Sequence, residues 1–460
     1  MTTPTTTTAL RLITTASPSA APAPAARLAA PTRRSFLAGA SAASAVAVGT
    51  ALSGGFSPAA AATTALPLVT PVWSESIRRS FGIAVQPQFQ NGPYGAEDVW
   101  VKYVAEMNAT YIRGKYSNAV SLRAATDTLI NQCRTLGLKW VMTVIPEDWS
   151  MTPAQLRGVL VDIRDRAADV CIAIEGMNEP NDYVDGSLVR PDWAEVAVAY
   201  QKVIWDFVKT TPALSHVAVL SPSLAMGVAD PSVDFAALAA AGLVNYIDYA
   251  GMHSYPGGLK PDNKVDVRMD YVRDYWSSKP TWVTETGYQN ALAAPLVGPR
   301  PVPYDVSATY GPRSLLEYFT RGCNSARFNL LNDVDPTNAD PQANYGLVDC
   351  PSSDPARWTF KPEYYVMRDF LAGLKDAPAG GGTYTPSPVP LQVTAPSTVK
   401  WLLTAKADGT TTLYAYLNAS IWDAIKRVPL TPAPVNVTVT DRAGARTIKV
   451  GASVIGIPIR

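Results

Sequence analysis

Two glutamates stand where a catalytic pair of carboxyl groups would be expected. Glu179 lies in an Asn-Glu-Pro tripeptide and Glu285 in a Thr-Glu-Thr-Gly segment, and each follows a short apolar run. Two carboxyl groups that face each other across a cleft can cleave a glycosidic bond, because one protonates the departing oxygen while the other attacks the sugar or activates a water molecule. Few other groups could transfer protons here, since the whole chain contains two histidines.

Three further polar residues follow apolar runs in the same way. Arg113 ends one run, and His253 and Tyr255 end another in the order His-x-Tyr. Arg113 and Glu179 are 66 residues apart, and Glu179 and His253 are 74 apart. His253 and Glu285 are 32 residues apart. Divided into two, two and one strand–helix units, these gaps give about 32 to 37 residues per unit. We therefore expect all these side chains at equivalent strand ends around one opening.

The apolar pattern from about Ser80 to Leu374 alternates between strand-like and helix-like segments. Strands are expected at Phe81–Val85, Thr110–Arg113, Trp140–Ile145, Cys171–Ile174, Val217–Leu220, Tyr249–His253, Thr281–Glu285 and Ala326–Leu331. Helices are expected at segments such as Ala96–Met107, Ala154–Ala168, Trp193–Lys209, Asp266–Trp276 and Arg313–Arg321. Eight strand–helix units in about 300 residues predict an α/β protein with a (β/α)8 TIM barrel. The alternative, an open doubly wound sheet, usually carries a G-x-G-x-x-G turn after its first strand, and this sequence has none there.

The C-terminal region has a different, β-rich pattern. We assign residues 73–376 to the barrel, 377–390 to a linker of Pro, Gly, Ser and Thr, and 391–460 to a small all-β sandwich. Leu66–Val72 is a candidate for a further strand of that sandwich. The strands expected after the linker are Val399–Thr404, Thr412–Tyr416, Val435–Val439 and Thr447–Val450.

The N-terminal 62 residues have the features of an export signal. They contain no Asp or Glu, and Arg33-Arg34 precedes Ser-Phe-Leu, a weakly apolar Ala/Gly/Val stretch and an Ala-Ala-Ala site. The arginine pair resembles a bacterial twin-arginine signal, which predicts a protein secreted to the periplasm, the cell surface or beyond. A membrane anchor is the alternative, but the stretch is short and Gly-broken for a span of about 20 residues. The mature form is therefore not expected in a membrane.

Composition narrows the partners further. The formal charge of +1 and the lack of a basic run argue against a nucleic-acid partner. Two histidines and four cysteines without a Cys-x-x-Cys spacing predict no metal site and no other cofactor. Cys323–Cys350 is the candidate pair if one disulfide forms. The oligomeric state stays open.

The motifs resemble those of clan A of the glycoside hydrolases. The similarity covers the barrel and rests on Asn-Glu-Pro after the fourth strand, His-x-Tyr after the sixth and Thr-Glu-Thr-Gly after the seventh. Lys-Pro-Glu-Tyr-Tyr at 361–365, followed by the β-rich region, is most similar to glycoside hydrolase family 39. The resemblance implies a retaining double displacement, with Glu179 as the acid/base and Glu285 as the nucleophile.

The resemblance also implies roles around the two glutamates. Asn178 would bind the sugar 2-hydroxyl, and His253 would line the same subsite. Tyr255 and Arg113 would hold Glu285 as a carboxylate. Because the acid must keep its proton, we expect the pKa of Glu179 to lie above that of Glu285, raised by the neighbouring negative charge.

Structural roles remain open for several of these residues. Arg113 could instead be an ion-pair partner of Glu175 inside the barrel, and His253 could be a packed, hydrogen-bonded histidine. Trp149, after the third strand, is a candidate for stacking on a sugar. The eighth strand lacks the Trp that many clan members place under the cleaved sugar, so the floor of that subsite is undefined.

We therefore expect a retaining enzyme that cleaves O-glycosidic bonds of an extracellular polysaccharide or oligosaccharide. An endo-acting enzyme on an exopolysaccharide is favoured, because an exported enzyme meets polymers first. A clan-A endoglycanase of the cellulase or mannanase kind is one alternative. A non-catalytic carbohydrate-binding barrel is the other, although a barrel without activity would usually have lost one of the two glutamates.

Overall fold

The structure is a computed structural model that describes residues 65–144, 151–181, 183–184, 187–188, 190–226, 230–294, 298–332, 340–377 and 382–460. The predicted export signal and Trp149 lie outside these ranges. Among the helices of the described ranges, none has both the length and the apolar character needed to span a bilayer.

Eight parallel strands form the barrel, and they are hydrogen-bonded in chain order from the first strand to the last. The eighth strand pairs with the first, and a single bridge from Leu220 to Tyr249 joins the fifth strand to the sixth. The predicted TIM barrel is therefore confirmed. The strands are β3 (Phe81–Ala84), β4 (Tyr111–Lys115), β5 (Lys139–Thr143), β6 (Cys171–Glu175), β9 (Ala218–Leu220), β10 (Ala250–His253), β11 (Thr281–Thr286) and β12 (Asn324–Phe328).

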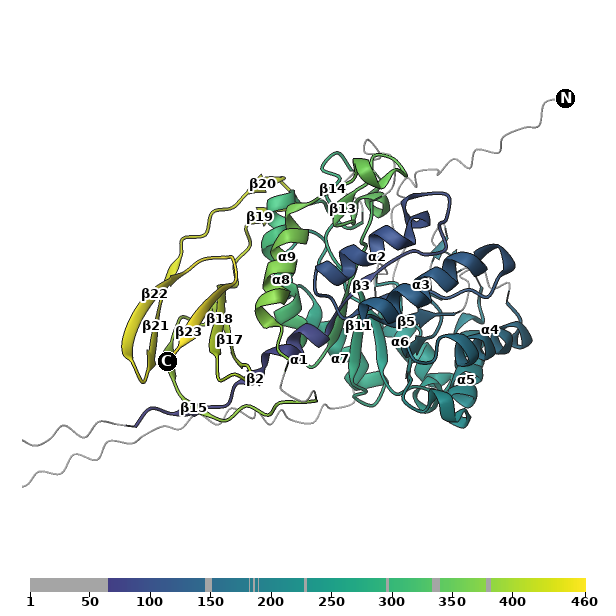
Figure 1. Ribbon diagram of the computed structural model, residues 1–460, viewed down its shortest axis with the longest axis horizontal. Helices are drawn as coiled ribbons and strands as arrows, with labels where there is room; N and C mark the ends of the chain where they lie inside the picture. The colour runs from purple at the N-terminus through teal and green to yellow at the C-terminus, as the bar shows by residue number, and fades with distance from the viewer. Residues whose placement is uncertain are drawn as a thin grey trace, which may run out of the picture. The chain divides into compact units, whose positions relative to one another are not determined.

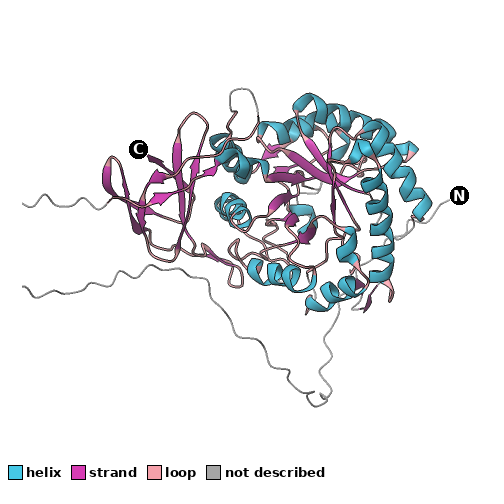
Figure 2. Ribbon diagram, turned by 90° about the horizontal axis from the view of Figure 1, so that it is seen from below, coloured by secondary structure: helices cyan, strands magenta, loops and turns pink. Residues whose placement is uncertain are grey.

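A helix follows each barrel strand, and Figure 2 shows these helices as a ring around the strands. The helix ends agree with the predicted ones within about two residues, except in α8. That helix begins nine residues earlier than predicted and passes through Pro312, a residue that usually marks a helix start. The helices are α2 (Glu97–Glu106), α3 (Arg123–Leu136), α4 (Pro153–Arg166), α5 (Trp193–Thr210), α6 (Ser232–Ala240), α7 (Val265–Tyr275), α8 (Tyr304–Phe319) and α9 (Pro362–Leu374).

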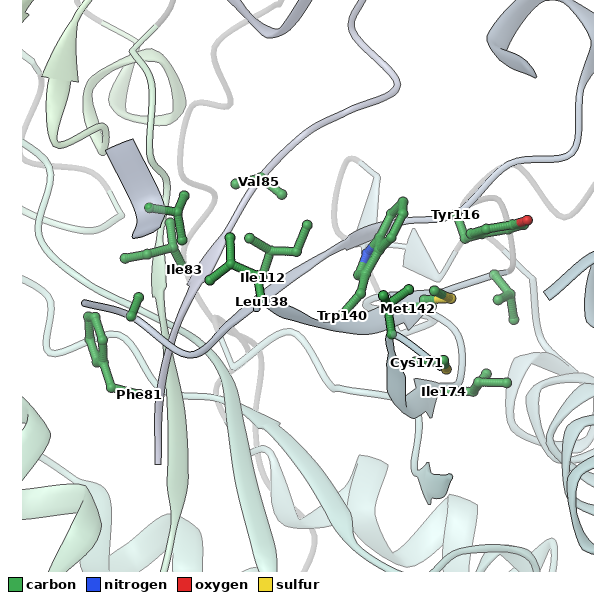
Figure 3. Close-up of a cluster of buried hydrophobic side chains, with 14 of the residues drawn as sticks. Phe81, Ile83, Val85, Ile112, Tyr116, Leu138, Trp140, Met142, Cys171 and Ile174 are labelled. Atoms are coloured by element: carbon green, nitrogen blue, oxygen red, sulfur yellow. The ribbon is translucent and has the colours of Figure 1, made fainter. Parts of the chain in front are cut away.

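Alternate side chains along each strand pack on opposite sides of the barrel wall. Those facing the helices form the main core, which includes Ile112, Trp140 and Met142 (Figure 3). Those facing inward form a smaller apolar layer that includes Tyr111 and Val141. This alternation matters for the site because Arg113 lies two residues after Tyr111 and therefore also points inward.

The C-terminal β-domain consists of two facing sheets around an apolar core. Segments ahead of the barrel contribute to it, as the sequence predicted. β1 (Leu68–Val69) pairs with β15 (Val389–Pro390), and β2 (Val72–Trp73) pairs with β17 (Val399–Ala405). Figure 1 shows the domain in yellow. Its main strands are β16 (Gln392–Thr394), β17 (Val399–Ala405), β18 (Thr411–Leu417), β21 (Val435–Asp441), β22 (Gly444–Val450) and β23 (Ile455–Ile459).

The cysteines are all free thiols, so the candidate disulfide does not form. The Sγ of Cys323 contacts the Sδ of Met269 at 3.7 Å, and the Sγ of Cys350 lies 3.6 Å from the carbonyl of Val348. Burial raises the pKa of both thiols to about 12. Nearness in sequence suggested the pair, but in the fold each thiol contacts another group instead.

Candidate active site

The polar residues singled out in the sequence gather at the carboxyl ends of the barrel strands. Arg113 lies in β4, Glu179 in the loop after β6, His253 at the end of β10 and Glu285 in β11. Arg113, Glu179 and Glu285 line a cavity of about 610 Å³ at the end of the barrel where TIM barrels carry their functional sites, while His253 contacts Glu179 without itself lining the cavity. The cavity is lined from several strands, by Gln86, Gln88, Phe89, Arg113, Gly114, Lys115, Thr143, Asn178, Glu179, Tyr255, Glu285, Phe328, Asn329 and Gln342.

Arg113 is buried and links three groups of the site. Its Nε lies 2.8 Å from Oε2 of Glu175, its Nη1 contacts Oε1 of Glu285, and its Nη2 lies 2.7 Å from Oδ1 of Asn178. Both interpretations of Arg113 therefore apply, since it pairs with Glu175 and also holds two residues of the cavity. Burial lowers the pKa of Arg113, but the charges of Glu175 and Glu285 outweigh burial and raise it, so the guanidinium stays charged.

Glu285 is held at both carboxylate oxygens. Arg113 donates to Oε1, and the hydroxyl of Tyr255 donates to Oε2 at 2.6 Å. Both partners are donors, which matches the acceptor-only carboxylate form. With 7% of Glu285 exposed, its position is fixed and one face of the carboxylate borders the cavity.

Glu179 is placed by an unusual backbone conformation. Its φ of 43° lies in the left-handed region, which costs a residue with a side chain about 1–2 kcal/mol. The neighbouring strand end holds this conformation, because the amide of Glu179 donates to the carbonyl of Ser223 at 2.8 Å and Asn178 bridges to the same residue. Strained backbone of this kind gathers at functional sites. The side chain of Glu179 is 33% exposed, against 9% for that of Glu285.

His253 lies between the two glutamates. Its Nδ1 is 2.7 Å from Oε1 of Glu179 and 3.5 Å from Oε2 of Glu285. Burial lowers the pKa of His253, but the charges of Glu285 and Glu179 outweigh burial and raise it above 6.5. His253 is thus in contact with both glutamates rather than only a packed histidine.

The pKa of Glu179 differs from the predicted direction. Burial raises it, but the charge of His253 and the hydrogen bond from its ring outweigh burial and hold the pKa below the usual range. The expectation that negative charge would raise this pKa was wrong, because the sequence did not show that a histidine lies directly beside the glutamate. The charge of His253 thus favours the carboxylate form of Glu179, and the charge of Glu179 favours the protonated form of His253.

Among the described residues, the one group of His, Cys, Asp and Glu with ligand atoms close enough for a metal ion is Glu179, His253 and Glu285. These candidate ligand atoms already have protein partners: Glu285 accepts hydrogen bonds from Arg113 and Tyr255, while His253 contacts Glu179. A divalent ion would also meet the positive charge of Arg113. The group fits proton transfer better than metal binding.

The aromatic side chains of Phe328 and Tyr255 line the cavity, and Tyr345 packs against both. Phe328, the last residue of β12, contacts Tyr345 and Tyr255, with ring centroids 5.5 and 6.1 Å apart. Tyr345 also packs against Tyr255 at 5.2 Å. The predicted strand ends at Leu331, three residues beyond the end of β12, and so does not identify Phe328 as the strand end. Tyr345 comes from a later segment, and no local motif marked it.

Six of the seven predicted site residues therefore lie together. Besides the two glutamates they are Arg113, Asn178, His253 and Tyr255. Trp149 lies outside the described residues. The shared arrangement is a fixed carboxylate facing a more exposed carboxyl group that contacts a histidine ring nitrogen, which suits acid–base chemistry coupled to nucleophilic attack.

No known family model matches the sequence, and no curated protein sequence matches it. Among solved structures, the fold is similar to a β-glucosidase from Exiguobacterium marinum (10% identity, TM-score 0.45, 65% of this chain and 98% of that one). It is also similar to a psychrophilic β-glucosidase from Micrococcus antarcticus (11%, 0.45, 66% and 99%). A third similar structure is a GH128 endo-β-1,3-glucanase from Amycolatopsis mediterranei in complex with laminarihexaose (14%, 0.39, 63% and 99%). Likenesses this distant carry no argument about activity, which has to come from the site itself.

Proposed function

We propose that this protein is a retaining glycoside hydrolase of the clan-A type. One observation carries the proposal: oxygens of Glu179 and Glu285, from opposite sides of the barrel mouth, lie with a ring nitrogen of His253 within 4.8 Å of one another. Retaining enzymes place their two carboxyl groups about 5–5.5 Å apart, whereas inverting enzymes need about 6.5–9.5 Å to admit a water molecule. The close spacing supports direct attack by a carboxylate on the sugar.

The surroundings of the two glutamates support different roles for them. Glu285 is fixed by Arg113 and Tyr255 and is the nucleophile that bonds to the anomeric carbon. Glu179 is more exposed and shares a proton with His253, so it protonates the leaving oxygen and later removes a proton from water. Arg113 orients Asn178 toward the sugar 2-hydroxyl.

Turnover and stereochemistry test the proposal. Purified protein should hydrolyse at least one member of a panel of aryl glycosides and polysaccharides, and proton NMR should show the product first with the anomeric configuration of the substrate. Binding without turnover across the panel would favour the non-catalytic barrel. An initially inverted product would contradict the retaining mechanism.

We predict that His253→Asn moves the alkaline limb of the kcat/KM profile to lower pH. In the native protein the shared proton is lost only as the pH rises through the raised pKa of His253, above 6.5. Without the imidazole, Glu179 must hold the proton alone, and a carboxylic acid loses its proton at lower pH than an imidazolium does, so the limb should move in the acid direction. Rates on an aryl glycoside from pH 3 to 9 provide the measurement.

His216→Asn is the matched control for this variant. His216 is the other histidine of the chain, is exposed and contacts the carbonyl of Ala168, so its removal should leave the profile unchanged. An unmoved alkaline limb in His253→Asn would show that the histidine does not hold the catalytic proton.

Activity is predicted to survive removal of metal ions. The carboxylates of Glu285 and Glu179 already interact with Arg113, Tyr255 and His253, so the site needs no metal ion to balance their charge. Incubation with EDTA followed by gel filtration should therefore change the rate by less than about twofold. Loss of activity that a divalent ion restores would show that the glutamates and His253 bind a metal.

The extracellular substrate and the narrower family are parts of the same proposal. We take the substrate to be a polysaccharide or oligosaccharide outside the cytoplasm, because residues 1–62 have the composition of an export signal. An exported enzyme meets polymers first, so we take cleavage to be at internal bonds of the glycan. Similarity to family 39 depends on the segment at 361–365, which begins α9. A cellulase- or mannanase-like endoglycanase is the second candidate. Turnover of cellulose or mannan in the polysaccharide panel, rather than of an exopolysaccharide, would favour it.

Export through the twin-arginine route gives a further prediction. Replacing Arg33-Arg34 with Lys-Lys should leave the protein in the cytoplasm of a bacterial host that has this route, because the pair is the feature its receptor reads. Immunoblots of cell fractions provide the measurement, with Arg11→Lys as the control outside the motif. Unchanged export would assign the protein to the general secretory route.

A further inference from the structure

One wall of the cavity carries groups that the proposed reaction does not use. Gln86, Gln88 and Phe89 follow β3, and Lys115 is the last residue of β4. All four line the same cavity as the two glutamates. They do not contact Glu179 or Glu285 through any hydrogen bond or ion pair in the described part of the chain.

Lys115 forms no ion pair with a carboxylate of the described residues. It lies two residues beyond Arg113 on the same strand, so both side chains face into the barrel mouth and Lys115 is nearer the opening. Arg113 pairs with two glutamates and His253 with a third. No described Asp or Glu comes within 4.0 Å of the ammonium group of Lys115, which leaves its charge available to a ligand.

Gln88 has a carbonyl oxygen without a hydrogen-bond partner and Phe89 has an exposed ring, and a sugar could contact both. The Oε1 of Gln88 is buried without a hydrogen-bond partner, while its Nε2 donates to Gln86 at 2.8 Å. A buried acceptor of this kind is unfavourable until a donor such as a hydroxyl reaches it. Phe89 is 60% exposed at the rim, and an exposed ring offers a flat apolar surface on which the face of a sugar ring can pack.

We propose that this wall is a subsite for an acidic sugar. The sugar ring packs on Phe89, a hydroxyl donates to Gln88, and an anionic ring substituent, either a uronate carboxylate or a sulfate, pairs with Lys115. The inference rests on the proposed glycosidase function and narrows its substrate to a polyanionic glycan.

The test is binding to acidic glycans by protein that cannot turn them over. Glu285→Gln is titrated calorimetrically with oligosaccharides of hyaluronan and of alginate, each before and after reduction of the carboxylates to alcohols, and with chondroitin sulfate before and after desulfation. At least one acidic form should bind, and neutralising it should weaken binding about 10- to 100-fold, as expected for a lost charge-assisted hydrogen bond. The pair that shows the loss identifies the anionic group.

Substitution of Lys115 should reproduce that loss. Lys115→Gln should weaken binding of the acidic form about as much as neutralising the glycan does, and should leave the neutralised glycan unaffected, because the two changes remove the same contact. Lys115→Arg should retain binding, as should Lys102→Gln on the exposed face of α2. Phe89→Ala should weaken both glycan forms equally, and Phe89→Trp should not.

The outcomes separate this inference from the proposed function. No binding of any acidic glycan, equal binding of charged and neutralised forms, or no effect of Lys115→Gln would overturn the acidic subsite. If the charge of Lys115 instead influences the catalytic glutamates, Lys115→Gln in otherwise native protein would change rates on neutral aryl glycosides. The acidic subsite predicts no such change. Failure of the function itself would appear as no turnover of any glycoside, whatever the binding results.

Discussion

Replacing Glu285 with glutamine should abolish turnover on every glycoside, lowering kcat by about 10⁴- to 10⁶-fold, as loss of an essential nucleophile does. No other group can take its place, because the reaction already needs Glu179 for proton transfer and Glu175 is fully buried in an ion pair with Arg113. Arg113 keeps Glu175 as a partner in the variant, so the fold should persist. Initial rates on an activated aryl glycoside measure the effect.

The control for this variant is an exposed glutamate of the barrel. Glu195→Gln on α5 removes the same charge away from the cavity and should keep the native rate. Thermal unfolding of both variants checks that a loss of rate is not a loss of fold. Residual activity of Glu285→Gln within about tenfold of the native rate would contradict its role as nucleophile.

Replacing Glu179 with alanine should have an effect that depends on the leaving group. General acid catalysis contributes about 10²- to 10⁴-fold, so substrates with poor leaving groups should slow by that amount. A dinitrophenyl glycoside needs no proton for departure and should still form the glycosyl-enzyme. Its hydrolysis should then be limited by the second step, in which Glu179 acts as base, and a burst of dinitrophenol should precede slow turnover.

Azide provides the decisive measurement on the Glu179→Ala variant. The anion needs no general base, so it should intercept the glycosyl-enzyme, raise turnover and give a glycosyl azide with retained configuration. The native protein should show no such rescue, because its carboxylate would repel the anion. An inverted azide product, or rescue in Glu285→Gln instead, would exchange the roles of the two glutamates.

The fold and the position of the site were predictable because they follow from local periodicity. Short apolar runs alternating with helical patterns can bury their apolar faces together only in a few arrangements, and polar residues at strand ends then share one side of the barrel. Arg113, Glu179, His253 and Glu285 lie near one opening for that reason. The strand boundaries were less certain, which is why Phe328 was missed at the end of β12.

The sequence alone determined the barrel, the β-domain and the two glutamates of the site, because each depends on residue type and spacing. Only the tertiary structure decided how charge is distributed there. The contact of His253 with Glu179 reverses the expected pKa shift, and Arg113 turns out to join Glu175, Glu285 and Asn178. These effects depend on distances of a few ångströms between side chains from different strands, and the electrostatic energy changes steeply over such distances. Linear spacing places strand ends around one opening, but it does not specify which side chains meet.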